Sequence, residues 1–592
     1  MSDYNAPVQD MQFILEHLCG MEELREFPAF TETTEDLVEA ILAESARFTR
    51  EVVAPLNQSG DQQGSSLSDG AVTTPDGFKE AYRAFVGGGW NGTPFEAEHG
   101  GMGLPWTITT ALQEMWQSSN LSWSLCPLLT IGAIESLIAH GTDELKATFL
   151  PRLVSGEWTG TMNLTEPQAG TDLSLLKSRA EREGDHYRIT GTKIFITYGE
   201  QDFTDNIIHL VLARLPDAPA GVKGISLFLV PKFLVNEDGS LGERNDAYAI
   251  GLEHKLGIHA SPTCVMSYGE SSDGAIGYLI GDEHDGLRCM FTMMNNARLN
   301  VGLQGVAVAE RAYQHAVAYA RERVQSAPVD GGKDSVTIIH HPDVRRMLMS
   351  MRAQTEAMRA LAYYTNAALD RSRHHEDSET RGYNSRRTDL LTPVVKAWCT
   401  DLGVDISSTG VQMHGGMGFI EETGAAQYFR DSRIAPIYEG TNGIQAIDLL
   451  GRKLLRDGGA AMDELLAELD ALPDSDDPEL APILAAQKNA TQTLRRATEW
   501  MLDPANNDVN RKFAGAHAFL HLAGTVVGGW LMTRAALTTA KGETTGASPE
   551  FLNSKRITAR FYADHILPRA DMHLATITRG GDSVMALAED AF

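Results

Sequence analysis

Apolar residues recur at intervals of three and four over most of this chain, a spacing that predicts amphipathic helices. Between Thr33 and Val53 they fall at Leu37, Ile41, Leu42, Ala46 and Val52. The same spacing predicts helices at 106–116, 131–138, 301–323, 341–369, 391–409, 485–502, 511–540 and 554–578. A polar connector is expected at 371–387, and the acidic stretch 470–479 is expected to be a solvated linker.

A different pattern occupies residues from about 159 to 286. Short β-branched or alternating runs, separated by turn residues, predict strands at 186–190, 193–197, 207–213, 225–230, 263–268 and 276–280. No helical spacing separates them, which favours an antiparallel β-domain.

The expected fold class is therefore α+β and multidomain. Its predicted parts are an N-terminal extension (1–35), an N-terminal α-helical domain (36–158), a middle β-domain (159–286), an α-helical bundle (287–456) and a C-terminal helical extension (457–592).

Charge and cysteine content narrow the function classes. With 50 basic and 79 acidic side chains the net charge is −29, which disfavours nucleic acid or an anionic membrane surface as the main partner. The first residues lack the basic and apolar regions of a secretory signal, and the five cysteines show no CxxC spacing. We expect a cytoplasmic protein without a zinc site of paired cysteines.

Two weak motifs have ordinary interpretations. Residues 87–92 satisfy GxGxxG, but a helix precedes them and Thr93-Pro94 follows, so they are interpreted as turn glycines. His517 and His521 have a spacing that can chelate a metal ion, yet the spacing suggests no carboxylate or cysteine partner. They are expected to be ordinary helix histidines, and no metal is predicted.

Three separated segments carry more specific chemistry. The first, 162–172, combines hydroxyls with turn residues, and the second, 193–197, is a strand with Phe195 and Thr197 on one face. The third runs from Gln412 to Gln445; its glycines allow close backbone approach, and Thr441 or Asn442 can cap a helix whose free amides suit an anion.

In this order the three segments resemble the acyl-CoA dehydrogenase family of flavoproteins, over roughly residues 35–455. The resemblance implies an α-helical domain, a β-domain and a second helical bundle, with FAD between the sheet and the bundle. It also implies a set of FAD contacts: Met162, Leu164, Thr165 and Thr171 at the isoalloxazine, Phe195 and Thr197 beside it, Thr441 near the phosphates, and Arg323, Gln412, Gly415 and Gly416 across a subunit interface.

By the same resemblance Glu439 is the catalytic base that removes the α-proton of an acyl-CoA thioester, while the β-hydrogen passes to the flavin as hydride. Such a base needs a pKa raised by an apolar pocket. Thr171, Arg298 and Gly440 are the expected substrate-binding residues. The implied partners are an acyl-CoA, an electron-transfer flavoprotein as electron acceptor, and further copies of the chain, with a dimer favoured.

The N-terminal segment and the long extension resemble a long bacterial branch of the family, some of whose members act on 3-methylmercaptopropionyl-CoA. The best guess for the reaction is its conversion to methylthioacryloyl-CoA in dimethylsulfoniopropionate breakdown. Three alternatives stay open. They are a short- or medium-chain acyl-CoA dehydrogenase without sulfur preference, an acyl-CoA oxidase, and a DNA-associated, damage-response flavoprotein of the same fold.

Overall fold

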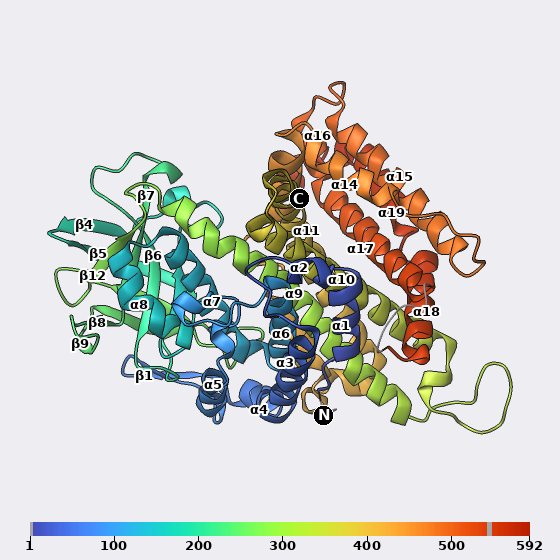
Figure 1. Ribbon diagram of the computed structural model, residues 1–592, viewed down its shortest axis with the longest axis horizontal. Coiled ribbons are helices and arrows are strands. Elements are labelled where there is room, and N and C mark those ends of the chain that lie inside the picture. Colours follow the sequence, from blue (N-terminus) through green and yellow to red (C-terminus); the bar gives the residue numbers. More distant parts are fainter. Residues whose placement is uncertain (1–3, 541–546) are drawn as a thin grey trace. The chain divides into compact units, whose positions relative to one another are not determined.

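A computed structural model of the chain describes residues 4–540 and 547–592 (Figure 1). The first three residues of the predicted N-terminal extension lie outside this description. The chain forms two compact units. The helical unit comprises the chain up to Arg47, Pro105–Ser118 and Arg298–Phe592, and the mixed unit comprises Phe48–Leu104 and Ser119–Ala297.

The helical unit is built from α-helices of very different lengths. They are α1 (Val8–His17), α2 (Met21–Arg25), α3 (Glu35–Phe48), α6 (Trp106–Ser119), α9 (Gly286–Glu322, which begins in the mixed unit), α10 (Pro342–His374), α11 (Ser378–Met413), α12 (Ala425–Ser432), α13 (Asn442–Ile447), α14 (Ala460–Asp470), α15 (Ala481–Leu502), α16 (Val509–Ala514), α17 (Ala516–Ala540), α18 (Pro549–His565), α19 (Arg569–Arg579) and α20 (Gly581–Val584). A π-helical segment, Asp448–Leu455, follows α13 directly.

The predicted polar connector at 371–387 exists, but it is limited to residues 375–377. Helix α10 continues through His374, and α11 begins at Ser378, where Asp377 caps it by accepting a hydrogen bond from the Thr380 N–H (2.8 Å). Polar residues on solvated turns of long helices caused the error, because they interrupt the apolar spacing without breaking the backbone.

In the extension, the helices predicted at 511–540 and 554–578 are each two helices. Gly515 separates α16 from α17, and a turn through Leu567 and Pro568 separates α18 from α19. The acidic stretch 470–479 is non-helical after Asp470, as expected of a linker.

A cluster of buried charges lies inside the helical unit. The Arg359 guanidinium of α10 donates to Asp10 of α1 (2.7 Å), Glu114 of α6 (2.7 Å) and Glu310 of α9 (2.7 Å). Lys555 of α18 donates to Asp10 and to Glu356, both at 2.7 Å. These side chains are nearly inaccessible to water. One cluster therefore unites segments from both ends of the chain.

The mixed unit combines four helices with the main sheet. Its helices are α4 (Leu56–Gln63), α5 (Phe78–Gly87), α7 (Leu121–His140) and α8 (Asp143–Ser155). Its strands are β1 (Ser66–Ser68), β2 (Ala71–Thr73), β3 (Thr159–Asn163), β4 (Arg179–Glu183), β5 (His186–Thr197), β6 (Ile207–Arg214), β7 (Ile225–Pro231), β8 (Phe233–Val235), β9 (Leu241–Arg244), β10 (Ala247–Leu252), β11 (Thr263–Tyr268) and β12 (Ala275–Ile280).

The main sheet has the strand order β10-β11-β5-β12-β7-β6-β3, and β4 pairs with β5 and β6. Most pairs are antiparallel as predicted, but β3 and β4 pair with β6 in parallel. The strands predicted at 186–190 and 193–197 are one strand, β5, which passes through Gly191. A Cβ there would lie 2.5 Å from the Ser178 hydroxyl, so Gly191 serves close backbone approach and does not form a turn.

The region before residue 158 is not all-helical, since β1 and β2 form a hairpin too short to give a periodic signal. Helix α7 is long and apolar enough to cross a membrane, but 94% of its apolar window is buried, which is typical of a core helix. The GxGxxG match at 87–92 ends helix α5 and enters a single 3₁₀ turn, in agreement with its interpretation as turn glycines.

Candidate active site

The loop between α12 and α13 holds Glu439 in an unusual backbone conformation. Glu439 and Gly440 have φ values of 56° and 83°, in the left-handed region. A non-glycine residue there costs roughly 1–3 kcal/mol, while glycine adopts the region freely. Thr441 then caps α13, its Oγ1 accepting a hydrogen bond from the Ile444 N–H (3.2 Å). The predicted cap is confirmed for Thr441.

Three side chains fix this loop to the surrounding helices. The Tyr438 hydroxyl donates to Gln304 Oε1 of α9. The Glu439 carbonyl oxygen accepts hydrogen bonds from Gln445 Nε2 (3.3 Å) and Arg298 Nε (3.4 Å). Arg298 is therefore brought to the Glu439 loop, as its predicted position in the site requires.

Burial sets the acidity of the Glu439 carboxyl group. Removal from water raises its pKa to about 7, although the positive charges of Arg298 and Lys396 oppose the rise. Tyr438 beside it is partly buried, and removal of its hydroxyl from water raises the pKa of that group well above the ordinary value. A carboxyl group with a pKa near neutrality can both accept and release a proton at physiological pH.

Lys396 of α11 is a charged neighbour that the sequence prediction missed. It is fully buried, and its Nζ donates to Asn442 Oδ1 (2.8 Å), the residue that follows Thr441. Burial lowers its pKa to about 7, against the attraction of Glu439 and Asp401. The signal that could have found it is its place inside the apolar run 394–398. A lysine there is expected to be buried away from solvent, which is unusual for a charged residue.

The mixed unit positions the predicted flavin-contacting segment. Met162 lies on β3, and Leu164 and Thr165 follow directly. Lys193 of β5 donates to the Leu164 carbonyl oxygen (3.0 Å) and to Glu166 (2.9 Å), and the Ile194 N–H donates to the Thr165 carbonyl oxygen (2.9 Å). The buried Lys193–Glu166 pair was also missed, since nothing in the spacing of the two residues relates them.

Phe195 lies at a bulge in β5 that alternation alone does not predict. Between paired positions Ile196 and Lys193, two residues of β5 lie opposite the single Val265 of β11. Phe195 has a φ of 61°, and 58% of its surface is exposed, while Ile196 is buried. Thr197 is half-buried. The aromatic ring is therefore offered to solvent by a local backbone irregularity.

The remaining predicted residues lie on the surface of their units. Thr171 is exposed in the loop before β4, and Gln412, Gly415 and Gly416 are exposed at the end of α11. Arg323 is exposed just after α9, and its guanidinium donates to Gln325 Oε1 (3.3 Å). Of the predicted set, the structure gathers Arg298, Glu439, Gly440 and Thr441 in the helical unit and Met162, Leu164 and Thr165 beside β5 in the mixed unit.

Family models match most of the chain. They are the acyl-CoA dehydrogenase N-terminal domain (residues 35–157), the middle domain (161–268), the C-terminal domain (284–455), and a further domain described as acetyl-CoA dehydrogenase C-terminal like (460–588).

Full-length relatives agree with these models. The chain is 49% identical to 3-methylmercaptopropionyl-CoA dehydrogenase of Ruegeria pomeroyi, covering 98% of this chain and 99% of the relative. It is 36% identical to a butyryl-CoA dehydrogenase of Syntrophomonas wolfei, covering 100% and 99%. A Bacillus anthracis acyl-CoA dehydrogenase structure, complexed with FAD, matches with a TM-score of 0.74 at 22% identity, covering 93% of this chain and 89% of that chain. The chain belongs to the acyl-CoA dehydrogenase family.

Proposed function

We propose that this protein catalyses the FAD-dependent α,β-dehydrogenation of 3-methylmercaptopropionyl-CoA to methylthioacryloyl-CoA, with Glu439 as the base. The observation that carries the reaction type is the partly buried Glu439 side chain with its pKa of about 7, on a loop anchored by Gln304, Gln445 and Arg298. The 49% identical relative supports the choice of substrate.

Glu439 contributes two groups to the reaction. Its carboxylate removes the α-proton, which is weakly acidic because the thioester carbonyl delocalises the developing charge. Its backbone N–H has no hydrogen-bond partner among the described residues, so it is free to donate to that carbonyl oxygen. FAD, when bound, accepts the β-hydrogen as a hydride.

The chain's own residues fit FAD in both units. In the mixed unit the exposed Phe195 ring offers an apolar face to a planar ring system. In the helical unit a Cβ at Gly415 or Gly416 would meet no atom within 4 Å, so their backbone is open to close approach. The exposed guanidinium of Arg323 suits a pyrophosphate.

Anaerobic titration of the flavin-loaded protein tests reaction and substrate separately. Addition of 3-methylmercaptopropionyl-CoA should bleach the visible flavin absorbance, and butanoyl-CoA serves as the matched control. Equal or better bleaching by butanoyl-CoA would reject the sulfur preference and retain the dehydrogenase. Absence of bleaching by both thioesters would reject the reaction.

A Glu439→Gln variant tests the base. It should retain bound flavin and thioester while the rate of flavin reduction falls roughly 10²–10⁴-fold, the range for loss of a positioned base. Reduction at the wild-type rate would remove Glu439 from this role.

We also propose a homodimer. Beside Gly415 and Gly416 three large apolar side chains are exposed, Met417, Phe419 (86%) and Ile420. A second copy of the chain would cover them and bring Arg323 and Gln412 to its FAD, as the family resemblance implies.

Light scattering should show a dimer, and Phe419→Asp should give monomers with weakened FAD retention. A tetramer would contradict the dimer, and an unchanged Phe419→Asp assembly would exclude this surface.

The remaining partners follow from the proposed reaction. Reduced flavin requires an electron acceptor, and we propose an electron-transfer flavoprotein. Rapid reoxidation by air with release of peroxide would instead indicate an acyl-CoA oxidase.

The five cysteines are buried and unbridged, which supports a cytoplasmic location. The net charge of −29 supports a protein that binds neither DNA nor a membrane surface. A salt-dependent DNA mobility shift would favour the DNA-associated alternative.

A further inference from the structure

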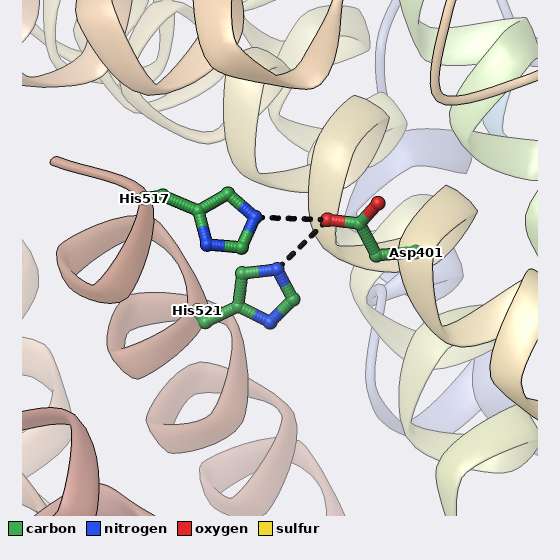
Figure 2. Close-up of side chains that lie close together, drawn as sticks. All are labelled: Asp401, His517 and His521. Carbon is green, nitrogen blue, oxygen red and sulfur yellow. Dashed lines mark hydrogen bonds and ion pairs between the residues drawn. The ribbon is translucent and has the colours of Figure 1, made fainter. Parts of the chain in front are cut away.

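Two histidines of the C-terminal extension meet a carboxylate of the bundle (Figure 2). His517 and His521 lie in the first two turns of α17, and Asp401 lies on α11. The Nε2 atoms of His517 and His521 lie 3.3 Å and 2.8 Å from the same oxygen, Asp401 Oδ2. The sequence spacing suggested no carboxylate partner for these histidines because Asp401 lies 116 residues from His517 in sequence.

The three side chains converge as metal ligands do. Their ligand atoms all lie within 4.8 Å of one another, and both imidazole rings direct Nε2 toward Asp401 (Figure 2). Zinc–nitrogen and zinc–oxygen bonds are roughly 2.0–2.2 Å, so neighbouring ligands on one ion lie roughly 3–3.5 Å apart. The two nitrogen–oxygen separations, 3.3 Å and 2.8 Å, are close to this spacing.

The carboxylate is held in place from behind. Asn442 Nδ2 donates to Asp401 Oδ1 (2.7 Å), which leaves Oδ2 directed at the histidines. Asn442 itself accepts a hydrogen bond from the buried Lys396 (2.8 Å). Such supporting hydrogen bonds orient ligands in metal sites and reduce the reorganisation needed for binding.

Access and ligand chemistry define the ion. The His517 side chain is 61% exposed, whereas those of His521 and Asp401 are 15% and 25% exposed, so an ion can reach the three ligands from solvent. Two imidazole nitrogens and one carboxylate oxygen suit Zn²⁺ and neighbouring divalent transition metals. Mg²⁺ and Ca²⁺ prefer sites made of oxygen ligands.

We propose that Asp401, His517 and His521 form a binding site for one divalent transition-metal ion of the zinc type, which clamps the extension helix α17 to the bundle helix α11. The three protein ligands leave a further coordination position for water. Asn442 connects this site to the Glu439 loop, and the ion stabilises the docking of the extension without taking part in the proposed reaction.

Metal content of the tag-free, flavin-loaded protein tests the proposal. After treatment with a chelator and re-addition of Zn²⁺, gel-filtered wild-type protein should retain one zinc ion per chain by elemental analysis. Mg²⁺ should not be retained. Zn²⁺ should also raise the melting temperature of the wild type, because an ion that binds only the folded chain stabilises it.

Variants at the ligands identify the site. His517→Gln and His521→Gln should each weaken zinc binding by on the order of tenfold or more, and the double variant should abolish both zinc retention and the thermal shift. Since His517 is largely exposed, its variant should fold normally. His565→Gln, on α18 outside the cluster, is the control and should bind zinc as the wild type does. No retained zinc in the wild type, or equal retention by the double variant, would overturn the proposal.

Discussion

Glu439 titrates near neutrality even though two cations oppose the rise in its pKa. Burial raises the pKa of this carboxyl group to about 7, so it is largely protonated at pH 6 and largely ionised at pH 8. The base must be ionised to accept a proton. We therefore expect kcat/KM to increase with pH through about 7 and then level off. A flat profile between pH 6 and 8 would contradict this assignment.

Arg298 should tune that profile. Its positive charge is the larger of the two that lower the pKa of Glu439. An Arg298→Met variant removes this charge, so the ascending limb of kcat/KM against pH should move to higher pH. Arg298→Lys keeps a cation at the same position and should move the limb less. Equal shifts in the two variants would show that charge is not the cause.

At the scale of single residues, the sequence predicts a residue's role when the residues that define the role are close together in the chain. Glu439, Gly440 and Thr441 are adjacent, and the cap at Thr441 depends only on residues three positions apart. Lys396 and Gln445 act through the folded chain, since burial and the path of α11 bring them to the loop. The bulge at Phe195 depends on the pairing of β5 with β11, and a pattern within β5 alone cannot predict it.

At the scale of elements, glycines of α17 allow it to pack closely on α11. A Cβ at Gly524 would overlap the Trp398 indole, and one at Gly528 would lie 2.8 Å from Trp398 Cη2. Gly524→Ala should lower the free energy of unfolding by about 1–3 kcal/mol through overpacking, measured by urea denaturation.

Gly382 provides the control for this substitution. It lies on α11, where a Cβ would make only an ordinary contact with the Arg386 side chain at 3.5 Å. Gly382→Ala should stabilise the protein by roughly 0.5–1 kcal/mol, because alanine favours the helix. If both variants behave alike, the contact with Trp398 does not limit the packing.

Helical spacing predicts the existence of elements better than their ends. Periodicity continues across Gly515 and Pro568, so one predicted helix covers two observed ones in each case. Conversely β1, β8 and β9 have three or four residues each, too few for an alternating pattern to be recognised. The parallel pairing of β3 with β6 is a property of topology, which spacing within a strand does not contain.

For the whole molecule, the buried charge cluster predicts that residues at both ends of the chain contribute to the free energy of unfolding of the helical unit. Lys555→Met leaves Asp10 and Glu356 without a cation that both now contact at 2.7 Å. Removing one partner of a buried ion pair costs about 3–5 kcal/mol, and we expect a loss of this size in thermal or urea unfolding.

The matched control is Arg560→Met on the same helix. Arg560 pairs with Asp564 four residues on, and both side chains are nearly half exposed. Exposed pairs of this kind contribute about 0–1 kcal/mol. A similar loss in both variants would mean that burial adds nothing to the cluster.

At this scale the sequence indicates the class of the long segments, helical or β, because long runs of one periodicity survive local errors such as the missed β1–β2 hairpin. The division into two compact units was not predictable from those runs. Residues 105–118 belong with the C-terminal helices, and they are joined there by contacts such as Glu114 with Arg359 across 245 positions.

The cluster also has a consequence for biosynthesis. Asp10 emerges from the ribosome early, whereas its partner Lys555 is translated 545 residues later. At roughly 5–20 residues per second this interval is roughly 30–110 s. During that time Asp10 has Arg359 as its cation but lacks the second one, Lys555. The charge cluster of the helical unit is therefore complete only when the end of the chain has been translated.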